Sequence, residues 1–167
     1  YLPVDRYGLV DPERVKAAIA PETILITIMY ANNEIGTIQP IKEIGAIARS
    51  HGIYFHVDGV AAVGQVSIQV EEENIDLLSI SSNDIYGPKG VGALYIREGC
   101  RIVPISFGGG QEHGLRSGSE NLPAIIGTGK AAEIAREELT NNAQRLVALR
   151  DKLIAGITSR VKEAYLN

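Results

Sequence analysis

The sequence has little of several features that mark specialised classes of protein. Its 167 residues include one cysteine and no tryptophan, and no apolar run reaches the roughly 18–20 residues that a membrane span needs. The lone Cys100 cannot form an internal disulfide, which is typical of a protein kept in the reducing cytoplasm. The formal net charge of −4 argues against a basic face that binds nucleic acid. The histidines and Cys100 lack metal-ligand spacing, so we predict no metal site. The short apolar runs and the negative net charge predict neither a membrane nor a nucleic-acid partner.

The composition that remains is that of an ordinary globular protein. With 45% hydrophobic and 22% charged residues, the chain can form a core, and its length suits one domain. Tyr1 is not an initiator methionine, and the chain stops at Asn167 just after a long helical pattern. We therefore expect this chain to be a piece of a larger protein.

Short apolar, β-branched segments alternate with helical patterns over much of the chain. We predict strands over residues 23–30, 53–57, 75–81 and 93–96. A helix is predicted to begin at Pro12 after the capping residue Asp11 and to end before Pro21, and a second runs from Ile41 to about Arg49. The strands look buried on both faces, which is typical of an α/β domain with a parallel or mixed sheet. From Pro123 to about Val161 the spacing of apolar residues predicts a long helix with one apolar stripe.

Small polar residues lie at the carboxyl ends of three predicted strands. Asn33 follows the first strand, Asp58 ends the second, and Ser81 ends the third. In sheets of this type the ligand usually binds at the carboxyl ends of the strands. The sequence therefore predicts a binding site built from these side chains.

Each candidate residue has a structural interpretation beside the functional one. A carboxylate at the end of a buried strand needs hydrogen bonds or a cation, so Asp58 could cap the segment that follows or pair with a protonated ring nitrogen such as that of pyridoxal phosphate. The hydroxyls of Ser81 and Ser82 could bind a phosphate or simply end a strand. Ser119 in the glycine-rich loop of residues 108–121 could also hold a phosphate, although many surface turns have a similar sequence.

Four segments of the chain follow one family's pattern in the same order. They are residues 31–40 (ANNEIGTIQP), 56–58 (HVD), 85–95 (IYGPKGVGALY) and 108–121 (GGGQEHGLRSGSEN). These segments resemble cysteine desulfurases, which are pyridoxal-phosphate proteins related to the class V aminotransferases. The resemblance implies a three-layer α/β/α large domain with a mostly parallel sheet. It also implies an enzyme that takes sulfur from L-cysteine, leaves alanine and passes persulfide sulfur to an iron–sulfur scaffold protein.

The resemblance also implies roles for individual residues. Asn33 matches an asparagine beside the cofactor, Asp58 matches the aspartate that pairs with the pyridinium nitrogen, and Ser81 matches a phosphate-binding serine. Ser82 lies in the same phosphate-binding stretch. Ser119 matches a threonine that reaches the phosphate from the neighbouring subunit, which implies a homodimer.

The chain departs from the family pattern at three cofactor-facing positions. Asp84 occupies the position of the Schiff-base lysine, Asn83 that of a histidine that helps bind the phosphate, and Ala61 that of a glutamine that bonds the ring hydroxyl. A carboxylate cannot form an imine, and it adds negative charge beside a phosphate. Lys89 is no replacement, because the family has a lysine there in addition to the catalytic one. We predict that pyridoxal phosphate binds weakly and non-covalently or not at all.

Further family features lie outside the chain. The family's persulfide cysteine and substrate-binding arginine come after the position of Asn167, so we expect residues 1–140 to be part of the cofactor-binding large domain and residues 141–167 to be a helix leading to a small domain. The first hypothesis is a cytoplasmic cysteine desulfurase homologue with impaired or no cofactor chemistry. One alternative is a non-catalytic, dimeric docking platform for an iron–sulfur scaffold protein. Another is a selenocysteine lyase or a related class V aminotransferase.

Overall fold

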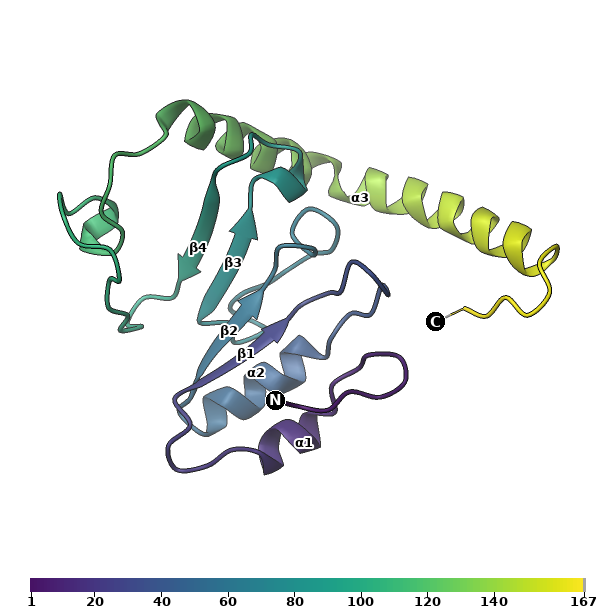
Figure 1. The fold of residues 1–167 in the computed structure, drawn as a ribbon, viewed down its shortest axis with the longest axis horizontal. Helices are drawn as coiled ribbons and strands as arrows, with labels where there is room; N and C mark the ends of the chain where they lie inside the picture. The colour runs from purple at the N-terminus through teal and green to yellow at the C-terminus, as the bar shows by residue number, and fades with distance from the viewer. Residues whose placement is uncertain (167) are drawn as a thin grey trace.

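The computed structural model describes residues 1–166 and contains one four-stranded sheet with helices around it (Figure 1). The elements follow in the order α1 (Pro12–Ala17), β1 (Leu25–Met29), α2 (Ile41–Ser50), β2 (Tyr54–Asp58), β3 (Leu77–Ser81), η1 (Asn83–Ile85), β4 (Gly92–Ile96), η2 (Glu112–Gly114) and α3 (Leu122–Thr158), where η denotes a short 3₁₀ helix. The predicted strands and helices are all present, with ends that differ by a few residues.

The sheet has the strand order β1-β2-β3-β4, with the first three strands parallel and β4 antiparallel to β3. In the register of the parallel strands, Met29 lies beside Asp58 and Asp58 lies beside Ser79. The predicted α/β class with a mostly parallel sheet is therefore confirmed. The register also brings the carboxyl ends of β1, β2 and β3 together at one end of the sheet, which we call its carboxyl edge.

Local sequence explains where the first two helices begin and how closely they pack. The Asp11 side chain accepts a hydrogen bond from the backbone N–H of Glu13 at 2.9 Å, which caps α1, and Pro12 occupies its first turn. In α2, Gly45 lies against the backbone of Glu73. A Cβ atom at position 45 would come within 2.0 Å of the Glu73 carbonyl oxygen, so this close approach requires glycine.

The hydrophobic core lies on one face of the sheet, under α1 and α2. Val15 of α1 and Ile44 of α2 pack there with Phe55 and Val57 of β2. This differs from the predicted burial on both faces: along β1 buried and exposed residues alternate, and Leu25 is 45% exposed. The physical reason is that α1 and α2 cover the same face, whereas α3 contacts η1 at the end of β3 (Figure 1).

The long helix α3 is continuous over 37 residues and confirms the predicted helix, although it ends at Thr158 rather than Val161. Its apolar stripe remains open along the second half, where Leu149 is 53% and Leu153 is 64% exposed. The predicted division after residue 140 falls inside this helix and stays a prediction, and residue 167 lies outside the described residues. Within residues 1–166, no helix combines the length and the apolar character needed to cross a membrane.

Candidate functional site

The loop after β1 carries Asn33 in a turn closed by the bridge between Ala31 and Ile38. The neighbouring Asn32 holds this turn, because its side-chain oxygen accepts hydrogen bonds from the backbone N–H groups of Glu34 at 2.9 Å and Ile35 at 3.1 Å. Such a turn is a typical use of an asparagine side chain. Asn32 therefore has a structural role that the sequence analysis missed, and the adjacent Asn33 is exposed.

Asp58 ends β2 at the centre of this edge and is half-buried. Its carboxylate accepts a hydrogen bond from the Val60 N–H at 3.0 Å, and its backbone carbonyl accepts one from the Tyr30 N–H at 2.8 Å. The residues after Gly59 form turns rather than a helix, so the Asp58 carboxylate caps a turn and not a helix. The carboxylate lies on the sheet face opposite the core, because the neighbouring Val57 is buried in that core.

The two serines at the end of β3 have different environments. Ser81 is half-buried and lies on the same sheet face as Asp58, whereas Ser82 has no exposed surface. The Ser82 hydroxyl contacts the Thr128 hydroxyl of α3 at 2.8 Å, and Thr128 also donates to the Ala124 carbonyl at 2.7 Å. This geometry gives the Ser82 hydroxyl a packing role that ties β3 to α3. Ser81 is the hydroxyl that this strand end leaves open.

Two of the three residues that depart from the family pattern follow directly in η1. Asn83 and Asp84 are both exposed, and Ile85 anchors this short helix in the protein interior. Tyr86 then adopts a left-handed conformation with φ of 63°, which is rare for a bulky residue, and its side chain is 90% exposed. The structure therefore places Asp84 in an exposed turn, where a substitution meets little steric resistance.

Ser119 lies in the segment between β4 and α3, which extends beyond the β4 side of the sheet (Figure 1). Internal hydrogen bonds hold this segment: Gln111 accepts from the Gly118 N–H at 3.0 Å, and the buried Ser117 accepts from the Gly110 N–H at 3.4 Å. Ser119 itself is exposed. In one chain, therefore, Asp58 and Ser81 lie on one face at the ends of neighbouring strands, Asn33 lies in the exposed loop after β1, and Ser119 belongs to a separate, self-bonded segment.

His56, two residues before Asp58 on β2, bridges three neighbouring strands. The Nδ1 atom of His56 lies 2.6 Å from the Thr27 hydroxyl of β1, and its Nε2 atom lies 2.8 Å from the Ser79 hydroxyl of β3. Burial lowers the pKa of His56 below its ordinary value of 6.5, while the charge of Asp58 acts in the opposite direction. In the strand register His56 lies beside Thr27 and Leu77, and Ser79 is two residues further along β3, so sequence spacing carried no signal for this bridge.

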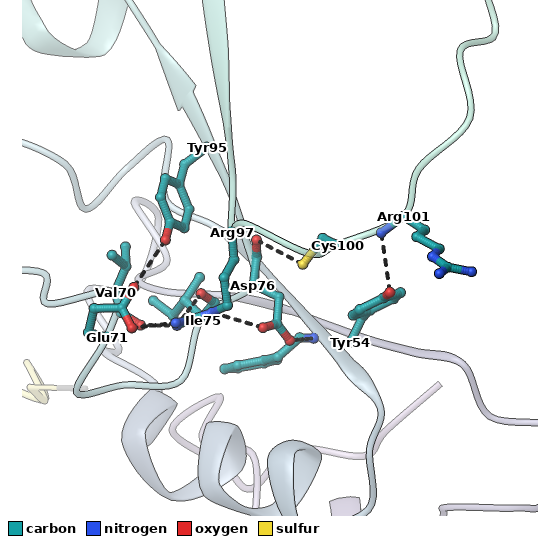
Figure 2. A network of polar contacts seen from close by, with 10 residues as sticks. Tyr54, Val70, Glu71, Ile75, Asp76, Tyr95, Arg97, Cys100 and Arg101 are labelled. Carbon is teal, nitrogen blue, oxygen red and sulfur yellow. Dashed lines mark hydrogen bonds and ion pairs between the residues drawn. The ribbon is translucent and has the colours of Figure 1, made fainter. Parts of the chain in front are cut away.

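A second polar network lies at the opposite end of the sheet (Figure 2). The Arg97 guanidinium, just after β4, donates to the carbonyls of Val70 and Ile75 at 2.9 Å each and to the Glu71 carboxylate. Its Nε atom also forms an ion pair with Asp76 at 3.0 Å. Because one side chain holds both the loop before β3 and the end of β4, this network stabilises the fold.

The lone cysteine belongs to this structural end of the sheet. The Cys100 sulfur lies 3.9 Å from the Asp76 carbonyl oxygen, and burial raises the pKa of its thiol (Figure 2). A raised pKa disfavours the reactive thiolate. Within residues 1–166, no cluster of three or more His, Cys, Asp and Glu side chains is placed to bind a metal ion.

Parallel strands, with polar side chains at their carboxyl edge, define an α/β domain of the kind that binds small ligands at that edge. The chain belongs to the aminotransferase class-V family, whose model matches residues 1–166. Members of this family are pyridoxal-phosphate-dependent enzymes.

The similarity to individual proteins extends over most or all of the chain. The chain is 54% identical over 167 residues to "Cysteine desulfurase IscS" of Methanosarcina thermophila and spans 41% of that protein's length. A solved "NIFS-LIKE PROTEIN" matches with a TM-score of 0.91 and 43% identity over 95% of this chain and 44% of its own. A structure described as "SspA in complex with cysteine" matches with a TM-score of 0.77 and 47% identity over 80% of this chain and 39% of its own.

Proposed function

We propose that this chain is part of a cysteine desulfurase homologue that supplies sulfur for iron–sulfur cluster assembly in the cytoplasm. The observation that carries the proposal is the carboxyl edge, where Asp58 and Ser81 lie on one face of neighbouring strands in the fold of a pyridoxal-phosphate family. The 54% identity to a relative named as a cysteine desulfurase supports L-cysteine as the substrate. The free Cys100 is consistent with a reducing compartment.

The residues at the carboxyl edge fit part of the cofactor. The half-buried Asp58 carboxylate suits a protonated ring nitrogen, and the open Ser81 hydroxyl suits a phosphate oxygen. Asn33 would lie beside the ring. Ser119 would come from a second copy of the chain, since its own segment extends beyond β4, so the proposed protein is a homodimer. When bound, pyridoxal phosphate supplies an electron sink for chemistry at the amino acid.

The aldehyde end of the cofactor does not fit the residues present. Asp84 has no amine with which to hold an aldehyde covalently or to move a proton as lysine does. Its charge would also oppose a phosphate near Ser81, and Asn83 cannot supply a positive charge. We therefore propose that cysteine turnover by this chain is impaired or absent, and we derive no chemical step through the cofactor.

The test is sulfide release from L-cysteine by the full-length protein with added pyridoxal phosphate and a thiol reductant, run beside Asp84→Lys and Asp84→Asn. Because Asp84 is exposed, both substitutions should leave the fold intact. We expect the lysine variant to release sulfide, while the parent and the asparagine variant do not. Asp84→Asn is the matched control, because it removes the carboxylate charge without adding an amine. Sulfide release by the parent at the rate of the lysine variant would refute the impaired site.

A non-catalytic docking platform is the second candidate, and the misfit at Asp84 favours it. A platform needs the dimeric fold and an open surface but no cofactor. The segment before the glycine-rich loop offers such a surface, because Val103 and Phe107 are each 83% exposed. Capture of an iron–sulfur scaffold protein by cofactor-free protein would favour the platform. Capture that requires both bound cofactor and Asp84→Lys would favour the enzyme.

A further inference from the structure

The open face of the sheet carries a histidine in an arrangement that ordinary strand packing does not require. His56 contacts the Thr27 hydroxyl at 2.6 Å and the Ser79 hydroxyl at 2.8 Å, so its ring spans three adjacent strands. A neutral imidazole has one donor nitrogen and one acceptor nitrogen, and hydroxyl groups can take either role. Either tautomer of the ring can therefore form both hydrogen bonds, and these bonds hold the ring in a fixed position.

The same two partners also tolerate the protonated ring. An imidazolium donates from both nitrogens, and the Thr27 and Ser79 hydroxyls can both accept. Protonation therefore adds a positive charge at His56 without breaking the bridge. The consequence of protonation is electrostatic rather than structural.

Asp58 lies close enough to His56 to interact electrostatically with that charge. It lies two residues after His56 on the same strand and the same face, which puts the two residues about 7 Å apart along β2. Asp58 is also the charged group that acts on the His56 ring. Along the four strands, the ionisable side chains that alternate onto this face are Tyr54, His56 and Asp58.

We propose that His56 is a positioning residue whose charge state controls how strongly the Asp58 carboxylate binds a cationic heteroaromatic ring. Neutral His56 leaves the full negative charge of Asp58 available to the ring, and protonated His56 offsets that charge. The proposal rests on the proposed pyridoxal-phosphate site, because that site supplies the cationic ring. Burial of His56 keeps the neutral form dominant near pH 7.

The first measurement tests the coupling without any ligand. An NMR titration should find the His56 pKa below 6.5, and Asp58→Asn should lower that pKa further because the attractive charge is gone. Two unit charges about 7 Å apart interact enough to change a proton affinity between about threefold and fiftyfold, depending on how far water screens them. An unchanged His56 pKa in Asp58→Asn would overturn the proposal.

The second measurement is equilibrium binding of pyridoxamine 5′-phosphate between about pH 5 and 8. This probe has no aldehyde, so it needs no lysine. The parent should lose affinity as the pH falls through the His56 pKa. A ring bound to Asp58 would lie about 10 Å from His56, so the loss should be about twofold to sixteenfold greater than in His56→Gln, whose side chain can donate and accept hydrogen bonds but cannot become charged. Thr27→Val is the matched control: it removes one hydrogen bond and should keep the pH dependence.

The outcomes separate the two proposals. Superimposable pH profiles for the parent and His56→Gln, with the probe bound, would mean that His56 is merely structural and would overturn the inference. If the probe does not bind while Asp58→Asn still lowers the His56 pKa, the proposed cofactor site fails and the coupling between His56 and Asp58 stands.

Discussion

Removal of the Arg97 side chain should destabilise the protein more than removal of any exposed arginine. Arg97 is 16% exposed, and it donates to the Val70 and Ile75 carbonyls at 2.9 Å each. A hydrogen bond from a charged donor contributes about 1.5 kcal/mol at the low end of its range, so the loss of both costs about 3 kcal/mol. We leave the small contribution of Glu71 out of this sum, because that carboxylate is 72% exposed and surface ion pairs contribute little.

The assay is thermal and urea unfolding of Arg97→Met, in which methionine keeps much of the apolar stem of the arginine. For a domain of this size, about 3 kcal/mol corresponds to a fall in the melting temperature of about 6–12 °C. Arg136→Met is the matched control, since Arg136 is exposed on α3 and its replacement should change the free energy of unfolding by less than about 0.5 kcal/mol. Equal melting temperatures for the two variants would refute the assignment of Arg97 as a structural clamp.

Two further predictions concern charge and close packing. The hydrogen bond from Arg97 holds the pKa of Glu71 below its ordinary value of 4.5, so its stabilising effect is complete above that pH and is lost as the pH falls through the lowered pKa. The difference in urea midpoint between the parent and Glu71→Gln should therefore shrink from pH 7 to below pH 4.5, and a constant difference would contradict the ion pair. Gly45→Ala should destabilise by about 1–3 kcal/mol, because the new Cβ would meet the Glu73 carbonyl oxygen at 2.0 Å. Gly129 lies inside α3, where a new Cβ atom would meet nothing within 4 Å, so Gly129→Ala should stabilise the protein by about 0.5–1 kcal/mol. If the melting temperatures of Gly45→Ala and Gly129→Ala move in the same direction, the close packing of Gly45 against Glu73 is refuted.

The local elements could be predicted from the sequence because their signals lie within a few neighbouring residues. Asp11 and Pro12 start α1 through a cap that reaches two residues along the chain. The alternation of strands and helices predicts the α/β class and, with it, the shared carboxyl edge at which Asp58 and Ser81 end neighbouring strands. The functional pattern at that edge was visible for the same reason: parallel strands bring their ends together whatever lies between them.

Burial was less predictable, because it depends on which elements cover a face. The run before Tyr30 is almost continuously apolar, which predicts burial on both sides, yet Leu25 and Met29 are exposed where no helix covers them. Ser82 resembles its neighbour Ser81 in sequence. The approach of Thr128, 46 residues away, gives its hydroxyl a hydrogen-bond partner, and Gly87 packs against it from the other side of η1 in sequence.

The sequence by itself determined the fold class, the family and the residue types at the strand ends, since each depends on local pattern or on motif identity. The tertiary structure alone decided which polar side chains meet. Thr27 and Ser79 are 29 and 23 residues from His56, and Arg97 reaches Val70 across 27 residues. No local periodicity encodes such contacts, because they arise from strand register and from loops that close over large sequence separations.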